Sequence, residues 1–418
     1  MFNSSQNFKV GWFGNIPEEW SVSKIGALYE LRTIKVSDKD YPPLSVTMKG
    51  IVPQLEFVAK TNSHDDRKLV KKGDFAINSR SDRRGSCGIS DYDGSVSLIN
   101  TVLKPRDEMN PKYYNWLFHT VQFADEFYKW GHGIVDDLWT TNWKDMKRID
   151  IPVPPLCKQK NIATFLDKKC SEIDSLTSDI QTQITTLEEY KKTLITETVT
   201  KGLPPNTKTK STDNKYWENI PENWELSDIK YLFEIVKRIA GKEGYDILSV
   251  TQKGLKIKDI SKNEGQIAES YANYQFVYPT DFVMNHMDLL TGWVDCSKYF
   301  GVTSPDYRVF RLRDTKNNLN YYKYVMQSCY MNKIFYSLGQ GVSNLGRWRL
   351  QTSTFNNFKI PVPPQDEQQQ IADYLDSKCS EIDTIIQTKK EQLETLAEYK
   401  KSLIYEYVTG KKEVPVNE

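Results

Sequence analysis

The sequence lacks the motifs that most catalytic and cofactor-binding proteins carry. It contains neither a GxGxxG string nor a P-loop, and its four histidines have no cysteine or carboxylate at metal-ligand spacing. The six cysteines are spread out, and no CxxC pair indicates zinc or a redox centre. We therefore expect no catalytic residue, no metal site and no cofactor bound by this chain.

A charge excess and long apolar runs are also missing. Lysine and arginine number 56 against 55 acidic residues, a formal net charge of +1, so any anionic partner must be met by local patches. No apolar stretch reaches the roughly 18 residues of a membrane-spanning helix, and the N-terminus does not resemble a secretion signal. These absences predict a soluble, cytoplasmic protein, and a length of 418 residues predicts two domains or more.

An internal repeat is the main feature that the sequence does contain. FLDKKCSEID at 165–174 returns as YLDSKCSEID at 374–383, an offset of 209 residues, and the IPVPP string before it recurs at the same offset. Weaker matches come earlier, since LSVTMKG at 44–50 answers LSVTQKG at 248–254. Each half is thus a long variable segment followed by a shorter, nearly invariant one, and such a repeat decides the architecture.

The nearly invariant segments have the pattern of long helices. From Lys158 to Thr200 there is neither Gly nor Pro, and breakers flank the segment on both sides. In both segments apolar residues recur every seven positions, a heptad pattern typical of a coiled coil. The pattern is interrupted by Lys191, Lys389 and Lys400, so each helix needs a defined partner. We expect the two helices to pair antiparallel with each other; the alternative is that each covers the core of its own domain. The predicted coiled-coil seam consists of Leu166, Ile173, Ile180, Leu187, Leu194, Leu375, Ile382, Leu396 and Leu403.

The variable segments have the pattern of compact mixed domains. Short β-type runs such as LSVTM, DFAINS and YRVFRLR, separated by Gly, Asp and Asn turns, are followed by helical stretches in both halves. The predicted fold is therefore α+β, with two α+β domains separated by two long antiparallel coiled-coil helices in a pseudo-two-fold internal repeat. The predicted segments are domain 1 at 1–155, a helix at 156–201, a linker at 202–218, domain 2 at 219–364, a helix at 365–410 and a tail at 411–418.

Basic and hydrogen-bonding side chains gather in a few loops of the variable segments. Arginine and asparagine are the usual readers of base edges, whereas lysine binds phosphates. An ordinary solvated loop has a similar composition, and that interpretation stays open at this point. The candidate DNA-binding residues are Lys49, Asn78, Arg80, Arg83 and Arg84 in the first half, and Lys253, Asn285, Asn344, Arg347 and Arg349 in the second.

The repeated strings resemble a known family. IPVPPQDEQQQIADYLDSKCSEID, followed by EYKKSLI and VTGKK, is similar to the conserved region of the specificity subunit of type I restriction–modification enzymes. Glu367, Gln368, Leu375 and Asp376 match the family's pattern, and the first copy departs from it at Lys158 and at VTKG. The resemblance covers both halves in the same order.

The resemblance implies a non-catalytic subunit of a larger complex. Each of two target-recognition domains would read half of a bipartite site in double-stranded DNA, and the helices would act as a spacer ruler and dock two methyltransferase (modification) subunits. Those subunits would use S-adenosylmethionine, and two restriction/translocase subunits would use ATP and Mg²⁺. Two alternatives from other classes are a coiled-coil scaffold that does not touch DNA and a stand-alone DNA-binding regulator.

Overall fold

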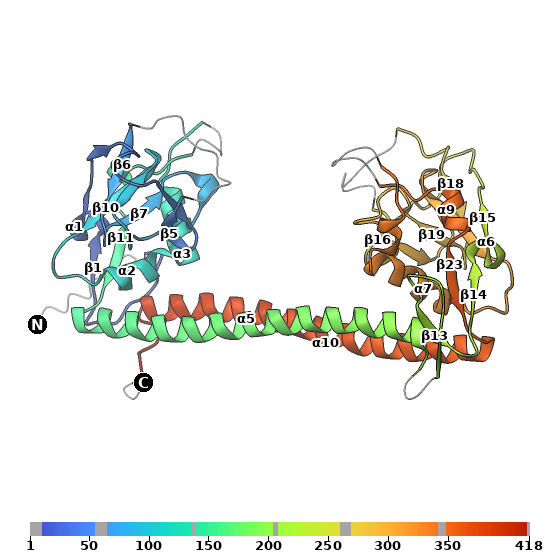
Figure 1. Ribbon diagram of the computed structural model, residues 1–418. Coiled ribbons are helices and arrows are strands. Elements are labelled where there is room, and N and C mark those ends of the chain that lie inside the picture. Colours follow the sequence, from blue (N-terminus) through green and yellow to red (C-terminus); the bar gives the residue numbers. More distant parts are fainter. Residues whose placement is uncertain are drawn as a thin grey trace, which may run out of the picture. The chain divides into compact units, whose positions relative to one another are not determined.

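The chain forms two compact units. The computed structural model describes residues 11–54, 65–134, 139–203, 208–259, 269–341 and 348–415. Met1–Ile180 and Lys390–Glu418 make up unit 1, and Gln181–Lys389 make up unit 2. Each unit therefore contains one α+β domain together with part of each long helix (Figure 1).

Unit 1 begins with a strand-rich domain and leads into the first long helix. Its strands are β1 Ser21–Lys24, β2 Tyr29–Leu31, β3 Lys35–Val36, β4 Leu44–Thr47, β5 Gly50–Pro53, β6 Arg67–Val70, β7 Phe75–Asn78, β8 Cys87–Ile89, β9 Gly94–Val96, β10 Asn100–Pro105 and β11 Asp150–Val153. Its helices are α1 Ile25–Leu28, the 3₁₀ turn η1 Ser81–Arg83, α2 Pro111–Phe118, α3 Val121–Lys129, α4 Trp143–Met146 and α5 Leu156–Lys201, whose second half belongs to unit 2.

Unit 2 repeats most of this order, with an additional strand pair, β12–β13, and without counterparts of β3 and η1 among the described residues. Its strands are β12 Thr209–Ser211, β13 Asn219–Pro221, β14 Glu225–Asp228, β15 Phe233–Val236, β16 Leu248–Thr251, β17 Gly254–Ile257, β18 Gln275–Val277, β19 Phe282–Met284, β20 Val294–Cys296, β21 Gly301–Thr303, β22 Arg308–Leu312 and β23 Lys359–Val362. Its helices are α6 Ile229–Leu232, α7 Leu319–Met331, α8 Ile334–Ser337, α9 Thr352–Asn356 and α10 Gln365–Val408, whose second half returns to unit 1.

Both domains are built around the same four-stranded antiparallel sheet. The strand order is β2-β10-β7-β8 in unit 1 and β15-β22-β19-β20 in unit 2. The registers correspond as well, because Ala76 pairs with Val102 and Val283 pairs with Val309. A two-stranded ribbon, β1–β11 or β14–β23, joins each domain to the long helix that follows it.

In each domain a bidentate ion pair holds the aspartate that directly precedes a central strand of the sheet, β7 or β19. Arg32 holds the buried Asp74 through contacts of 2.5 and 2.9 Å. Arg238 holds the buried Asp281 in the same way, at 2.6 and 3.3 Å. Since a buried carboxylate is costly unless it is paired and hydrogen-bonded, the two domains solve the same local problem with equivalent residues.

Each long helix is tied to its own domain by a buried glutamine. Gln159 is 2% exposed, accepts a hydrogen bond of 2.9 Å from the backbone N–H of Asn110 and donates one of 2.8 Å to the carbonyl of Pro154. Gln368 is 1% exposed and accepts the equivalent bond from Asn318 at 2.9 Å. A buried polar group of this kind must be satisfied, so the glutamines fix how the helices leave the domains.

The aspartate of the repeated FLD and YLD strings makes a second tie. Asp167 accepts hydrogen bonds from Trp116 Nε1 at 2.9 Å and from a lysine of the same helix, α2. Asp376 accepts one of 2.6 Å from the hydroxyl of Tyr324 on α7. Figure 1 shows α2 and α7 lying next to the long helices in their respective units.

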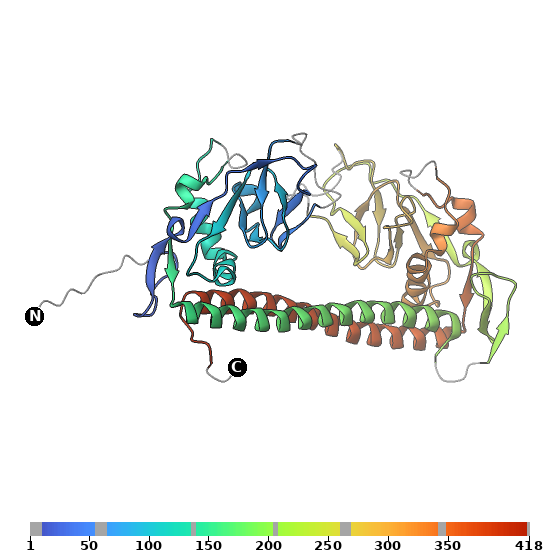
Figure 2. The ribbon, with the colours of Figure 1, turned by 60° about the vertical axis from the view of Figure 1, so that its left-hand side comes forward.

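The long helices α5 and α10 pack together, and this confirms the predicted pairing. They comprise 46 and 44 residues and lie side by side in both ribbon views (Figures 1 and 2). In unit 1 the ring of Phe165 lies 4.5 Å from that of Tyr407, so the start of α5 meets the end of α10. In unit 2 Lys191 near the end of α5 bonds Asp383 near the start of α10, as an antiparallel pair requires.

The nine predicted seam residues fall into two burial classes. Leu166, Ile173, Ile180, Leu375, Ile382 and Leu403 are buried, and Leu187, Leu194 and Leu396 are half-buried.

The lysines that interrupt the heptads reach polar groups on the partner helix. Lys191 Nζ lies 2.6 Å from Asp383, and Lys400 Nζ lies 2.6 Å from Asp174. These two pairs are related by the offset of 209 residues, whereas Lys389 donates to the side chain of Gln183 at 2.5 Å. The lysine stems cover apolar surface while the ammonium groups reach the solvated edge.

Two stretches of the first domain are each interrupted in the structure. VSLINTVL at 96–103 contains the last residue of β9 and the start of β10, separated by a turn in which Asn100 Nδ2 donates to the carbonyl of Ser97 at 3.1 Å. The long aromatic stretch from residue 113 divides into α2 and α3, because Thr120 caps α3 by accepting from the N–H of Phe123. The α+β class of both domains is confirmed. In the part of the chain that the structure describes, no helix has both the length and the apolar composition to cross a membrane.

Candidate DNA interface

An asparagine ends the same central strand in both domains. Asn78 ends β7, and its Oδ1 accepts a hydrogen bond of 3.0 Å from the N–H of Arg80. Asn285 directly follows β19, and its Oδ1 accepts one of 3.3 Å from the N–H of Met287. An asparagine that bonds the N–H two residues on fixes a tight turn. Both side chains therefore position the loop that follows the strand.

Lys49 and Lys253 occupy the same position in two equivalent hairpins, β4–β5 and β16–β17. In each hairpin the threonine two residues before the lysine donates across the turn to the following glycine's carbonyl, at 2.8 Å for Thr47 and 2.9 Å for Thr251. That glycine has a φ of +102° in both hairpins, a conformation that favours glycine. Both lysines are exposed and suited to contact phosphate.

The three arginines of the first domain have different surroundings. Arg80 is exposed, and Arg83 lies 3.6 Å from the carboxylate of the preceding residue. Arg84 pairs with Asp125 on α3, and its guanidinium carbon lies 4.9 Å from the ring centroid of Tyr128. Arg84 is therefore already engaged within the domain, whereas Arg80 presents its guanidinium to solvent.

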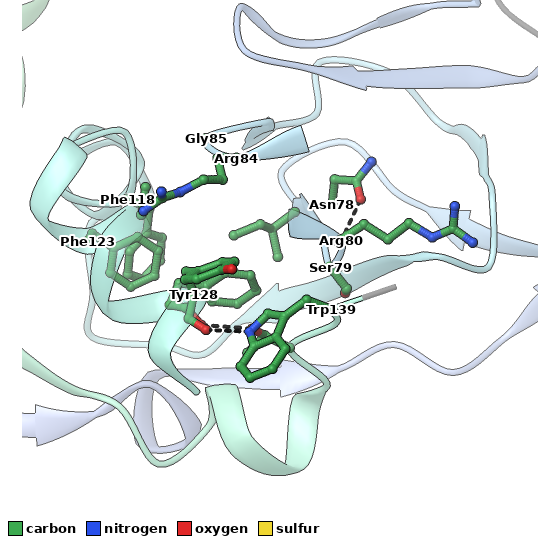
Figure 3. Close-up of a pocket in the computed structure, with 13 residues that line it drawn as sticks. Asn78, Ser79, Arg80, Arg84, Gly85, Phe118, Phe123, Tyr128 and Trp139 are labelled. Carbon is green, nitrogen blue, oxygen red and sulfur yellow. Dashed lines mark hydrogen bonds between the residues drawn. The ribbon is translucent and has the colours of Figure 1, made fainter. Parts of the chain in front are cut away.

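The structure brings three of the five first-domain candidates together around one pocket, shown in Figure 3. The Arg84 side chain lies over aromatic side chains, and that of Arg80 extends away from them (Figure 3). Lys49 and Arg83 do not line this pocket. Its edge is formed by Asn78, Arg80 and Arg84, and its wall by Phe118, Phe123, Phe127, Tyr128 and Trp139.

The second-domain candidates are not gathered in the same way. Arg349 is exposed and exchanges two backbone hydrogen bonds of 3.0 Å with Gln340. Asn285 lines a pocket together with Lys258 and Asp288, and neither Lys253 nor Arg349 borders it. Asn344 and Arg347 lie outside the residues that the structure describes.

A closed loop was not found by sequence reasoning and is common to both domains. His132 and Thr140 exchange two backbone hydrogen bonds of 3.0 Å, as Gln340 and Arg349 do in the second domain. A tryptophan lies just inside each closure: Trp139 packs on Tyr128 with ring centroids 5.7 Å apart, and Trp348 packs on Tyr336 at 5.5 Å. The sequence contains a signal for this feature, because Trp139 and Trp348 are 209 residues apart, which is the offset of the repeat.

Arg308 is a second residue that sequence reasoning missed. It is only 4% exposed, and its Nη2 donates to the carbonyl of Leu350 at 3.0 Å and to Thr352 Oγ1 at 3.3 Å. Burial lowers the pKa of Arg308 to about 10, so the guanidinium stays charged at neutral pH. It thus fixes the chain just after the closed loop of the second domain.

The residues beside Arg308 differ in kind between the domains. Burial, and then the charges of Arg308 and Arg349, lower the pKa of His286 to about 4, so the imidazole is neutral at pH 7. At the same place in the first domain, Ser79 Oγ lies 2.9 Å from Thr101 Oγ1. One backbone frame therefore carries a small neutral pair in one domain and a histidine–arginine pair in the other.

The described residues include no group of three or more His, Cys, Asp and Glu side chains arranged to hold a metal ion. Burial raises the pKa of Cys87 and Cys329 above the usual thiol value, which keeps both thiols protonated. The loops and the first-domain pocket offer hydrogen-bond donors, positive charge and aromatic surface. These are the groups with which proteins bind nucleic acid.

Sequence comparisons relate both halves of the chain to a known family. Residues 17–186 and 221–395 each match the type I restriction modification DNA specificity domain. The type I restriction enzyme MjaVIII specificity subunit of Methanocaldococcus jannaschii is 25% identical over 441 residues, covering 98% of this chain and 97% of the relative. The putative type I restriction enzyme MjaX specificity subunit of the same organism is 24% identical, with the same coverage.

Solved structures share the fold. A chain from a study of complex assembly and conformational transition in the type I R-M system aligns with a TM-score of 0.70 at 13% identity, covering 95% of this chain and all of that one. The HsdS subunit from Thermoanaerobacter tengcongensis aligns with a TM-score of 0.53 at 12% identity, covering 95% and 98%. With two matched specificity domains on a shared fold, this chain belongs to the family of type I restriction–modification specificity subunits, the non-catalytic subunits that give such a system its DNA specificity.

Proposed function

We propose that each α+β domain reads one half of a bipartite site in double-stranded DNA. The observation that carries this proposal is the repeat itself: two domains with the same sheet, hairpin and asparagine turn carry different side chains on that frame. The proposed division is target-recognition domain 1 at 1–155, helix 156–201, linker 202–218, target-recognition domain 2 at 219–364, helix 365–410 and tail 411–418.

The proposed complex contains further subunits. Two modification subunits, which methylate adenine with S-adenosylmethionine, dock on the repeated helical segments, since two copies of one partner need two copies of one surface. Two restriction/translocase subunits that use ATP and Mg²⁺ complete the assembly. Because its target is cellular DNA, we expect the complex to act in the cytoplasm.

The proposed contacts divide into two kinds. Lys49 and Lys253, at exposed hairpin tips, contact phosphates, whereas Arg80, Arg83 and Arg349, with exposed guanidinium groups, are placed to reach base edges. Asn78, Asn285 and Arg84 already hold parts of their own domains and act by positioning the loops. Asn344 and Arg347 stay candidate base readers from the sequence alone.

The long helices are proposed to set the distance between the half-sites. The 46 residues of α5 form a rod that lengthens by about 1.5 Å with each inserted residue, so about four inserted residues add one turn. A double helix rises about 3.4 Å per base pair. A length added to the helices can therefore be converted into an expected number of added base pairs between the half-sites.

Exchanging residues 1–155 for the same segment of another family member tests the modular proposal. We expect only one half of the methylated sequence to change, because the second domain and its contacts stay intact. Methylated adenines are mapped genome-wide in cells that carry the complete complex. A change in both halves of the motif would sink the proposal.

An insertion of one helical turn tests the ruler. Four residues placed near Thr196 in α5, matched by four at the facing level of α10, lengthen the rod by about 6 Å, slightly more than one turn. We expect the non-specific spacer to grow by about one or two base pairs. The same mapping of methylated adenines reads the spacer, and an unchanged spacer contradicts the ruler.

Replacement of Lys49 and of Arg80 by alanine separates phosphate contacts from base contacts. Lys49→Ala should weaken binding to every DNA sequence alike and reduce the salt slope by about one, whereas Arg80→Ala should relax one base position at a cost of about 1–3 kcal/mol. Binding is measured by fluorescence anisotropy over a range of salt with target and single-mismatch duplexes.

Lys24→Ala is the matched control for Lys49→Ala, because Lys24 is an exposed lysine on β1, the strand of the ribbon that leads into α5. It should leave affinity and specificity unchanged. If Lys49→Ala altered binding to one sequence only, its assignment to phosphate would be wrong.

A further inference from the structure

The two copies of the helical segment are alike in their buried residues and opposite in their surface charge. Residues 156–172 contain four lysines and two carboxylates, whereas the equivalent residues 365–381 contain one lysine and five carboxylates. The buried positions hardly differ: Ile162, Leu166 and Cys170 answer identical residues 209 positions later. The charge difference therefore lies outside these buried positions.

The basic copy borders a groove in unit 1. The floor of this α5 groove is apolar and includes Trp20, Ile162 and Phe165, which are nearly buried. Lys158 and Lys168 lie along α5 at its edge, and the C-terminal segment after α10 forms the opposite edge.

The charges at this groove are only partly compensated within the unit. Lys158 Nζ lies 3.4 Å from Glu413, with both side chains substantially exposed, and Lys412 pairs with Glu406 at 2.9 Å. Lys168 is exposed. An exposed ion pair contributes little, about 0–1 kcal/mol, so Lys158 stays available to an acidic group on a partner.

The equivalent face of α10 in unit 2 is acidic. Glu367 stands where the first copy has Lys158, Asp373 where it has a threonine, and Ser377 where it has Lys168. Glu367 accepts a hydrogen bond of 3.0 Å from the side chain of Asn223, and Asp373 accepts one of 2.8 Å from Gln369, so both carboxylates have neutral partners. The α10 face thus keeps its negative charge.

We propose that the two modification subunits of the proposed complex dock at these two faces with unequal affinity, so that a complex with a single modification subunit forms first. This inference rests on the proposed function. One partner surface cannot complement a basic face and an acidic face equally, because like charges brought together oppose binding.

The two faces differ by four charge units at these three positions, since a lysine is exchanged for a glutamate, a threonine for an aspartate and a lysine for a serine. We expect the two dissociation constants to differ by about tenfold or more at low salt. The two steps should also respond to salt in opposite directions, because screening weakens the attractive contact and relieves the repulsive one.

A transplant of surface residues tests the inference. The variant Lys158→Glu, Thr164→Asp, Lys168→Ser gives α5 the residues of α10, and Glu367→Lys, Asp373→Thr, Ser377→Lys does the reverse. The modification subunit of the same restriction–modification system is titrated onto the full chain, and one-to-one and two-to-one complexes are counted by native mass spectrometry at low and high salt.

The wild-type chain should fill in two resolved steps, and either transplant should merge them into one. One transplant should merge them at the tighter constant and the other at the weaker one. Lys192→Glu is the control, because this exposed lysine of α5 recurs at 401 in α10 and distinguishes neither copy. It should leave the two steps resolved. Thermal melting confirms that each variant is folded.

Two results overturn the inference alone: equal steps with equal salt dependence in the wild-type chain, or loss of DNA affinity by the first transplant without any modification subunit present. The second result would make the α5 groove a DNA surface. Failure of the modification subunit to bind the wild-type chain at all would instead overturn the proposed function.

Discussion

The antiparallel contact between α5 and α10 is the constraint on which the rest of the molecule depends. Within unit 1 the start of α5 packs on the end of α10, and within unit 2 the start of α10 packs on the end of α5. The apolar seam supplies most of the stabilisation, since Lys191–Asp383 and Lys400–Asp174 are half-exposed pairs that contribute about 0–1 kcal/mol each. The pairs act mainly on register, because a shifted helix would leave each seam lysine without its carboxylate.

Within each unit, the domain attaches to the long helices through equivalent contacts. The buried glutamines at 159 and 368 and the aspartates at 167 and 376 connect the long helices to α2 in unit 1 and to α7 in unit 2. A loop side chain placed on such a frame keeps a fixed position relative to its helix. The repeated strings of the sequence therefore encode attachment, and the variable segments are free to diverge in what they contact.

Local sequence signals predicted the long helices. The surroundings of individual arginines could not be predicted, because they depend on contacts between residues that are far apart in the sequence. Heptad spacing, proline breakers and the 209-residue offset are all visible along the chain, so two paired helices and two α+β domains could be derived. The engagement of Arg84 by Asp125, 41 residues away, could not, because it depends on how α3 packs beside η1. Arg308 was missed for a related reason. Its burial depends on Leu350 and Thr352, which lie more than 40 residues further along the chain, and the sequence around the arginine does not reveal these partners.

We propose that equivalent attachment and different side chains make the two domains into two half-site readers. The most direct measurement is a map of methylated adenines for a chain in which residues 219–359 are replaced by a second copy of residues 15–150. Because each copy would be attached in the same way at the start of a long helix, we expect a target whose two halves are the same sequence on opposite strands. A motif that kept its original second half would contradict this proposal.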